Sequence, residues 1–471
     1  MGRNGVECMQ QMRRAGNRPQ GRVGEVLRLA GPAIVENLLV TLVQYVDTAM
    51  VGSLGAVATA AVAVNASPMW LLSGIMTSVG VGGMALAARF YGAGDYDGAE
   101  RVCGQMAACA AVLSALCMAV VWLISNRLPV WMGAEAEVAP LASDYLRIVA
   151  LGFIPNYMGV VLANALRAAG NMRTPMLLTG LANVLNVIGN TLLIFPSRTV
   201  RMLGLVFPVW GAGLGVQGAA IATAISTATS GVLMILALVL GRRTRIRLRG
   251  KYLRPQIELL MRMLRVGVPA ALERIAINVG QILFARIVAS FGTAQLAAHH
   301  LAITVESLGY MPAFGIQAAA TALVGQSLGA KRPDDAETYG RICNRMGIVC
   351  MCLASALMVA FARPLMAIFT RDEQVQHIGA WLLCFCAAEE PFFGVAIVMS
   401  GALRGAGDTR VPFYISLCTM WCVRLVVAYV FGTLLGLGIY GAWAGMVADL
   451  AVRGVWLYAR FARGKWKEIT V

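Results

Sequence analysis

Charged residues are scarce in this chain. Only 13% of its 471 residues are Asp, Glu, Lys or Arg, which is about half of the share typical of soluble domains. Hydrophobic residues make up 59% of the sequence, and the mean hydropathy is +0.71. This composition excludes an ordinary soluble protein. It is typical of a chain that crosses a bilayer several times, with about 20 apolar residues in each crossing.

The motifs of common enzymes are also missing. There is no G-x-x-x-x-G-K-[ST] loop for nucleotide phosphates and no G-x-S-x-G or H-E-x-x-H motif. We therefore expect no enzyme, no ATP-driven pump and no cofactor. The eleven cysteines lack zinc spacing and lie in predicted spans or on the predicted cytoplasmic side, so we expect no structural disulfide. The N-terminus lacks the apolar stretch of a cleavable signal peptide.

Long apolar segments dominate what is present. Their length and continuity predict an all-α integral membrane protein with 12 transmembrane helices. The predicted spans are 30–52, 60–86, 103–125, 144–166, 175–196, 216–240, 267–289, 298–324, 343–362, 378–402, 412–435 and 440–460.

The basic residues are distributed unevenly about these spans. Of the 39 Lys and Arg residues, most fall on the side of the predicted membrane that holds both termini. The opposite side holds only Arg127, Arg198, Arg201, Arg363 and Arg371. By the positive-inside rule, this asymmetry predicts that both termini are cytoplasmic. The net charge of +16 is thus a matter of topology, with help from anionic lipid, and does not indicate binding to nucleic acid.

The two halves of the chain repeat each other. Residues 27–175 recur at 264–412, always 237 positions later, with Arg, Gly and Pro coinciding. Since each half has an even number of spans, the halves are parallel repeats, and we expect two six-helix bundles related by a pseudo-twofold axis. The predicted parts are a disordered cytoplasmic arm (1–25), the N-terminal bundle (26–241), a basic cytoplasmic linker (242–262), the C-terminal bundle (263–462) and a cytoplasmic tail (463–471).

One segment breaks the repeat. Ser197 to Gly215 has no counterpart in the second half, which is shorter there by 14 residues. We expect this segment to form an outward-facing loop or a short interfacial helix.

In the N-terminal half, polar residues within the spans suggest a proton or cation site. Glu36 and Asp47 are eleven residues apart, so they share one face of a helix. Asn183, Asn186 and Asn190 form a polar stripe on the fifth span. If the first and fifth spans face each other, Asp47 gains amide partners. The alternative is a hydrogen-bonded structural cluster.

The C-terminal half contains further acids within its spans. Glu273 is the repeat mate of Glu36, Glu306 lies in the eighth span, and Glu389 and Glu390 precede Pro391 in the tenth. Adjacent helical residues are 100° apart, so we expect at most one of Glu389 and Glu390 to face a central cavity cleanly. Each acid either lines that cavity, where Na⁺ is a possible ligand, or pairs with a buried base.

Two copies of an R-[AG]-A-G-[ND]-x-R-x-P motif follow the fourth and tenth spans, from Arg167 and from Arg404. Gly permits a left-handed helix end and Pro starts the next helix, so these motifs predict structural turns.

Together these features resemble the multidrug and toxic compound extrusion (MATE) family of antiporters, over nearly the whole chain. The motifs that carry the resemblance are Val46-Asp47-Thr48, Gly92-Ala93-Gly94, Leu166-Arg167-Ala168-Ala169-Gly170-Asn171, Pro269-Ala270-Ala271-Leu272-Glu273, Ala297-Ala298-His299, Gly325-Gln326-Ser327-Leu328-Gly329 and Leu403-Arg404-Gly405-Ala406-Gly407-Asp408. The resemblance implies a V-shaped pair of bundles that opens alternately to either side. It also implies efflux of amphipathic, often cationic, compounds in exchange for H⁺ or Na⁺.

The match to the family's functional residues is partial. The family's Asp in the first span is present as Asp47, but the partner acid that one branch carries in the fifth span is Asn190 here. Another branch places cation ligands in the seventh and tenth spans, where Glu273 and Glu389 or Glu390 lie outside an alignable motif.

We therefore expect a monomeric secondary antiporter of the inner (plasma) membrane. Its partners are small organic cations or amphipathic compounds, H⁺ or Na⁺, and the lipid bilayer. One alternative is a flippase for a lipid-linked saccharide precursor. The other is a non-transporting membrane protein or intramembrane enzyme.

Overall fold

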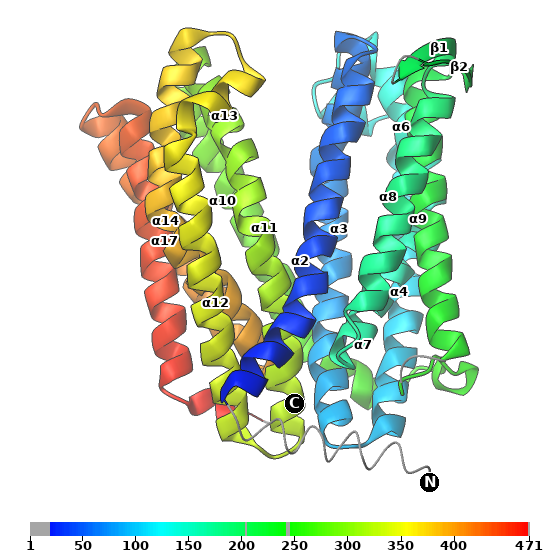
Figure 1. Cartoon of the computed structure of the whole chain (residues 1–471), viewed down its shortest axis with the longest axis vertical. Helices are drawn as coiled ribbons and strands as arrows, with labels where there is room; N and C mark the ends of the chain where they lie inside the picture. The colour runs from blue at the N-terminus through cyan, green and yellow to red at the C-terminus, as the bar shows by residue number, and fades with distance from the viewer. Residues whose placement is uncertain (1–18, 203–204, 242–244, 470–471) are drawn as a thin grey trace. The chain divides into compact units, whose positions relative to one another are not determined.

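The computed structural model describes residues 19–202, 205–241 and 245–469. Helices dominate the described chain (Figure 1). By contacts it divides into two compact units: unit 1 comprises Met1–Asn37, Ala88–Gly94 and Leu272–Val471, and unit 2 comprises Leu38–Ala87 and Asp95–Ala271. Each unit is described separately below.

Unit 2 holds most of the first half of the sequence. Its helices are α2 (Pro19–Gly52) from Leu38 onward, α3 (Ala56–Gly92) up to Ala87, then α4 (Tyr96–Ile124), α5 (Leu128–Trp131), α6 (Val138–Leu151), α7 (Phe153–Ala168), α8 (Arg173–Leu193), α9 (Gly215–Leu240) and the beginning of α10 (Ile257–Ala289). The remaining parts of α2 and α3 belong to unit 1. A 3₁₀ turn lies at Gly250–Tyr252. Met76, Leu146 and Phe153 are fully buried in its core. Glycine allows α7 and α9 to touch, since a Cβ at Gly231 would lie 1.8 Å from the Pro155 carbonyl oxygen.

Unit 1 holds most of the second half. Its helices are the rest of α10, then α11 (Thr293–Gly329), α12 (Pro333–Ala360), α13 (Ala362–Phe369), α14 (Glu373–Gly405), α15 (Arg410–Cys418), α16 (Leu425–Val427) and α17 (Gly438–Ala462). Two π-helical stretches, Thr419–Arg424 and Ala428–Leu434, flank α16, and a 3₁₀ turn lies at Lys465–Glu468. Asp372 begins α14 by accepting hydrogen bonds from the amides of Gln374 and Val375. Trp443 and Leu382 are fully buried in the core of this unit.

The helices match the predicted spans closely. Ten described helices are long and apolar enough to cross a membrane, and the bent pair α6 and α7 makes eleven. This pair covers the fourth predicted span as two helices at 56°, meeting at Gly152. Pro155 lacks an amide hydrogen, so the helix cannot continue regularly through this turn. The twelfth predicted span lies in the helix α17, which is not among these eleven, so the predicted count of 12 is not confirmed.

Two predicted segments differ in the structure. The segment without a repeat counterpart is neither a loop nor a helix but a β-hairpin, in which β1 (Pro196–Met202) pairs antiparallel with β2 (Leu205–Ala212). β-branched residues in both strands favour this conformation. The helix α2 begins at Pro19, so it includes the last residues of the predicted disordered arm; residues 1–18 lie outside the described residues.

Both copies of the repeated motif form the predicted turn. Gly170 has φ of 78° and Gly407 has φ of 82°, the left-handed conformation that glycine adopts without strain. Asn171 and Asp408 follow these glycines, and each fixes its turn with a side-chain bond: Asn171 to Thr174 and Asp408 to Arg460.

Candidate functional site

The predicted polar cluster of the N-terminal half forms in unit 2. Asp47 lies near the end of α2, and Asn190 lies on α8. The Asn190 side-chain amide donates a hydrogen bond of 2.5 Å to Asp47 Oδ1, and the same nitrogen lies 3.1 Å from Asn186 Oδ1. The first and fifth predicted spans thus meet at Asp47, which was the condition for this acid to gain amide partners.

This cluster continues toward α9. The Asn186 amide donates to the hydroxyl of Thr223 over 3.3 Å. Asn190 Oδ1 and Asn183 Nδ2 are buried and have no hydrogen-bond partner among the described residues. Asp47 thus has an amide partner and no guanidinium partner within the described chain, and the cluster keeps open positions for a proton or a water molecule.

Glu36 does not belong to the unit that holds this cluster. It is buried, with 7% of its surface exposed, and it belongs to unit 1, whereas Asp47 belongs to unit 2. The shared helical face predicted for these two acids from their spacing stays a prediction.

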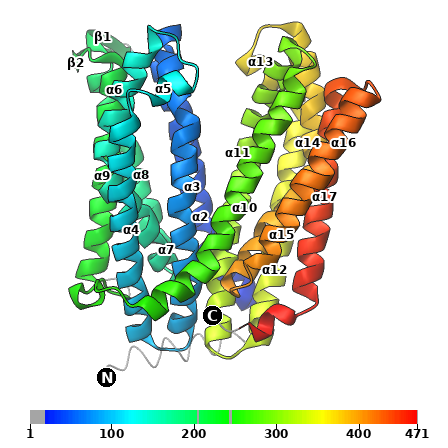
Figure 2. The same cartoon turned by 180° about the vertical axis from the view of Figure 1, so that it is seen from behind.

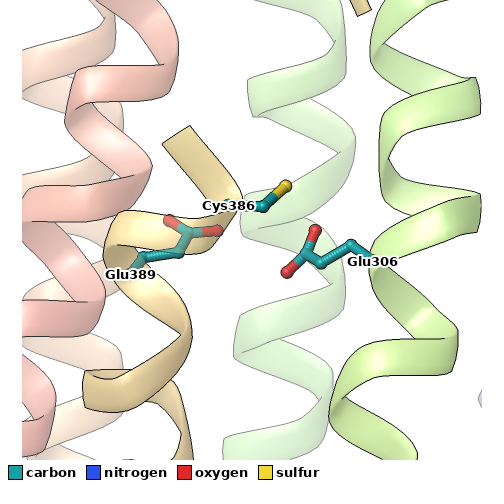
Figure 3. Close-up of side chains that lie close together, drawn as sticks. All are labelled: Glu306, Cys386 and Glu389. Atoms are coloured by element: carbon teal, nitrogen blue, oxygen red, sulfur yellow. The ribbon is translucent and has the colours of Figure 1, made fainter. Parts of the chain in front are cut away.

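A second acidic cluster lies in unit 1, between α11 and α14. Glu306 on α11 faces Cys386 and Glu389 on α14, and the side chains of all three point toward a common centre (Figure 3). One donor atom from each residue lies within 4.8 Å of the others, and all three residues are buried. The Cys386 thiol is hydrogen-bonded to the Glu306 carboxylate.

Glu390 extends this cluster. Its carboxylate interacts electrostatically with Glu306, and its Oε1 lies against Gly309, 3.1 Å from the place that a Cβ would take there. Both Glu389 and Glu390 are completely buried. The prediction that at most one of them faces a central cavity cleanly concerns direction rather than burial, and it stays a prediction.

The carboxylates of Glu389 and Glu390 lack hydrogen-bond partners among the described residues. None of their four oxygens has a hydrogen bond within the described part of the chain. A buried, unpaired carboxylate is costly unless it binds a proton or a cation. This property separates the two residues from the paired acids of the same unit.

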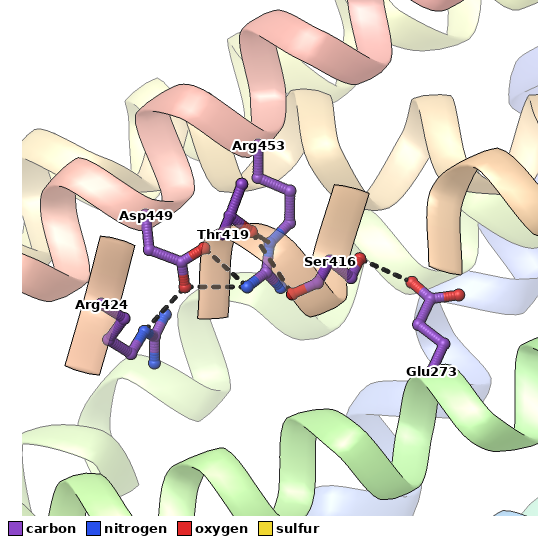
Figure 4. A network of polar contacts seen from close by, with 6 residues as sticks. All are labelled: Glu273, Ser416, Thr419, Arg424, Asp449 and Arg453. Atoms are coloured by element: carbon purple, nitrogen blue, oxygen red, sulfur yellow. Dashed lines mark hydrogen bonds and ion pairs between the residues drawn. The ribbon is translucent and has the colours of Figure 1, made fainter. Parts of the chain in front are cut away.

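A network of buried ion pairs adjoins the cluster (Figure 4). Asp449 on α17 accepts hydrogen bonds from Arg424 over 2.7 Å and from Arg453 over 2.7 and 2.8 Å. Arg453 also donates to Thr419 over 3.0 Å. Thr419 and Arg424 both lie in a π-helical stretch, a geometry that is frequent at functional sites. Arg424 interacts electrostatically with Glu306 and Glu389 as well.

Glu273 has a different environment from the other acids. Arg404 donates to it over 2.9 Å. The Ser416 hydroxyl also donates to it over 2.9 Å, as Figure 4 shows. Of the two interpretations given for Glu273, pairing with a buried base fits the geometry, although the base is Arg404 of the repeated motif and none of the arginines within the spans.

Two members of the C-terminal site were missed by the sequence reasoning. Asp449 was overlooked, although its spacing of four residues from Arg453 in an apolar segment is the signature of a buried ion pair. Cys386 was not singled out among the eleven cysteines, although it is one helical turn from Glu389 and Glu390. Among the described residues, Glu306, Cys386 and Glu389 form the group close enough to share a bound cation.

Comparison with known proteins agrees with these features. A family model described as MatE matches the chain twice, at residues 32–192 and 269–430, once in each repeat. The chain is 31% identical over 447 residues to the probable multidrug resistance protein NorM of Thermotoga maritima, covering 95% of this chain and 94% of the relative. The probable multidrug resistance protein NorM of Deinococcus radiodurans is also 31% identical, with 93% and 94% covered.

Solved structures of MATE transporters share the fold. The crystal structure of MATE in the straight conformation superposes with a TM-score of 0.86 at 23% identity, covering 94% of this chain and 97% of that one. The Vibrio cholerae MATE transporter VcmN gives 0.86 at 21% identity, with the same coverage. The chain therefore belongs to the MATE family of multidrug efflux transporters and is a multi-pass membrane transporter rather than an enzyme.

Proposed function

We propose that this protein is a secondary antiporter that exports amphipathic or cationic organic compounds in exchange for H⁺. The coupling groups are Glu306, Glu389 and Glu390 in the C-terminal half, with Asp47 in the N-terminal half. Proton binding stabilises one global conformation and substrate binding stabilises the other, so the two ligands are coupled through a shared equilibrium.

One observation carries the proposal. The four carboxylate oxygens of Glu389 and Glu390 are buried and unpartnered within the described chain. The carboxylates of Glu306, Glu389, Glu390 and Asp449 are all buried in this unit, whereas among the described residues only two guanidiniums, those of Arg424 and Arg453, are equally buried. Burial without charge balance is unfavourable, so the cluster needs additional positive charge. Protons that enter and leave would supply it in each transport cycle.

The chemistry of the ligands favours H⁺ over Na⁺. Hard cations require several oxygen ligands, whereas a thiol is a soft ligand. Cys386 occupies one of the three donor positions, and the other two are the carboxylates of Glu306 and Glu389. A proton needs only one carboxylate oxygen and a hydrogen-bond acceptor, which this arrangement offers.

The membrane topology completes the proposal. The excess of Lys and Arg on one side of the spans supports cytoplasmic termini and insertion in the inner (plasma) membrane of a bacterium. The transporting species in this proposal is a monomer.

Proteoliposomes that contain the purified protein test this proposal. Transport of a fluorescent organic cation out of the proteoliposomes is followed under an imposed pH gradient and, separately, under an imposed Na⁺ gradient. We expect the pH gradient alone to drive transport, and we expect the Glu389→Gln/Glu390→Gln variant to lose this drive. Its exchange of labelled for unlabelled substrate, which needs no net proton movement, should persist.

A second measurement separates coupling from folding. Substrate added to wild-type protein in weakly buffered detergent should release protons, which a pH dye detects, and the double variant should release none. Glu258→Gln is the matched control, because the Glu258 side chain is 83% exposed and lies outside both clusters. The proposal is contradicted if a pH gradient drives transport by the double variant as it does by the wild type, or if a Na⁺ gradient alone drives transport by the wild type.

A further inference from the structure

The segment that follows α9 places three arginines on one face. Arg245, Arg247 and Arg249 are exposed, whereas Ile246 between them is fully buried. Exposure alternates along this segment, since Leu248 between Arg247 and Arg249 is half-buried and Arg249 has an extended backbone. The amide of Leu248 donates to the Leu238 carbonyl oxygen at the end of α9, which fixes the segment against unit 2.

These arginines line a pocket beside the beginning of α4. Its volume is about 390 Å³, and its walls are Tyr96, Asp97, Glu100, Arg245, Arg247 and Arg249. Figure 2 shows the chain leaving α9 and passing α4 before it enters α10. Arg245 donates to the Tyr96 hydroxyl over 2.8 Å and lies 5.1 Å from the centre of its ring.

The positive charges of the pocket are only partly balanced. Arg249 pairs with Glu100 over 2.8 Å, while Asp97 accepts a hydrogen bond from the Tyr252 hydroxyl and lies 3.4 Å from Arg101. Within the described chain, neither Arg245 nor Arg247 pairs with a carboxylate. Two guanidiniums are thus available to an anion, and the planar guanidinium suits the oxygens of a phosphate.

The walls of the pocket are held in place. Gln105, which is 1% exposed, donates to the carbonyl oxygens of Tyr252 and Arg254 over 2.8 Å and accepts from the Gln256 amide over 2.9 Å. The stem of Arg247 packs on Gly241, where a Cβ would lie 2.5 Å from it. A fixed site loses less conformational entropy on binding than a mobile one.

Apolar side chains lie on both sides of the segment. Val239 and Leu240 at the end of α9 are 49% and 59% exposed, and Ile257 and Met261 at the start of α10 are 75% and 58% exposed. A charged pocket between exposed apolar side chains has the pattern of a membrane interface, with headgroup contacts above and acyl contacts below.

We propose that this pocket binds the phosphate of an anionic phospholipid, with Arg245 and Arg247 as the main ligands. A soluble phosphate offers the same charged group, but it leaves the flanking apolar side chains without contacts. The lipid is therefore the occupant that uses the whole surface, and the site is independent of the coupling clusters proposed above.

Lipid binding to the purified full-length protein in detergent tests the proposal. Tail-labelled phosphatidylglycerol and phosphatidylcholine are titrated against the wild type, Arg247→Gln and Arg245→Gln/Arg247→Gln. We expect the wild type to prefer phosphatidylglycerol, the single variant to bind it about fivefold more weakly, and the double variant about 25-fold more weakly, as expected for removing basic residues at an anionic surface. Thermal unfolding of each variant verifies folding.

The matched control is Arg265→Gln, which removes one exposed arginine of α10 outside the pocket. Its affinity should stay within about twofold of wild type, because only screened, long-range attraction is lost. Equal losses in Arg247→Gln and Arg265→Gln would show diffuse surface charge and overturn the proposal. Glycerol 3-phosphate and inorganic phosphate serve as competitors. Displacement of the lipid at equal concentration would assign the pocket to a soluble anion and likewise overturn it.

Discussion

The side-chain nitrogen of Asn190 lies 2.5 Å from Asp47 Oδ1 and joins α8 to α2 within one unit. A carboxylate that accepts from an amide keeps its charge and its second oxygen, whereas a carboxylate held by a guanidinium is committed to one partner. The neighbouring Asn190 Oδ1 is itself buried without a partner in the described chain. This geometry leaves Asp47 able to change its partner during a transport cycle.

The first prediction concerns Asp47 itself. Asp47→Asn keeps the shape of the side chain but removes its charge, and we expect pH-driven efflux to fall to background in proteoliposomes. Asp144→Asn is a suitable comparison, since Asp144 is also an acid of unit 2 and accepts a hydrogen bond of 3.1 Å from the exposed side-chain amide of Gln217. If Asp47→Asn transports as the wild type does, with the same response to the pH gradient, Asp47 has no part in coupling.

The sequence predicted the N-terminal cluster better than the C-terminal one. Three asparagines at helical spacing define a stripe, and one acid at the same depth in another span can meet it. In the C-terminal half, the sequence offered several acids and several arginines. Which of them pair depends on the rotation of each helix about its axis, and composition does not determine that rotation. Glu273 accordingly pairs with Arg404, which motif reasoning had assigned to a turn.

The helices could be predicted because the hydropathy and length of each apolar segment can be read directly from the sequence. The hairpin and the π-helical stretches could not, because they depend on the local backbone conformation. The hairpin β1 and β2 occupies a segment that was predicted as a loop or a helix. The π-helical stretch at Thr419–Arg424 could not be predicted from residue spacing, because the 100° per residue used there holds only for a regular α-helix. It is this stretch that aims Arg424 and Thr419 at the network around Asp449.

The second prediction concerns the contact between Gly309 and Glu390. In Gly309→Ala the new Cβ lies 3.1 Å from Glu390 Oε1 and 2.3 Å from Met358 Cε, a flexible methyl that can move. We expect the carboxylate to be displaced and pH-driven efflux to fall about tenfold, while the helix itself gains stability from alanine. Gly24→Ala meets nothing within 4 Å and should transport normally. Normal coupling in Gly309→Ala would show that Glu390 tolerates displacement and does not need this position.

The third prediction concerns Asp449, which is completely buried between two arginines. Asp449→Asn removes the carboxylate that accepts hydrogen bonds from both Arg424 and Arg453, and breaking a buried pair in this way costs about 3–5 kcal/mol. We expect a clear fall in the midpoint of thermal unfolding in detergent. Asp334→Asn, at a side chain that is 96% exposed, should lower the free energy of unfolding by about 0.5 kcal/mol or less, and the midpoint should move correspondingly little. An unchanged midpoint in Asp449→Asn would mean that the network contributes nothing to stability.

The last prediction distinguishes Glu273 from the unpartnered acids. Both carboxylate oxygens of Glu273 accept a hydrogen bond of 2.9 Å, one from Arg404 and one from Ser416. The carboxylate oxygens of Glu389, in contrast, have no hydrogen bond within the described chain. Glu273→Gln removes the charge that compensates the largely buried Arg404, and we expect a loss of about 3 kcal/mol in stability. Ser416→Ala removes one hydrogen bond from the same carboxylate and should cost about 1 kcal/mol.

Transport measurements complete this comparison. If Glu273 is a structural partner of Arg404, the folded fraction of Glu273→Gln will respond to the pH gradient as the wild type does, while its thermal midpoint is lowered. A variant that unfolds at the wild-type temperature but no longer responds to the pH gradient would reverse the assignment and move Glu273 into the coupling machinery. Because stability and gradient dependence are measured on the same protein, the two roles give opposite results for this single substitution.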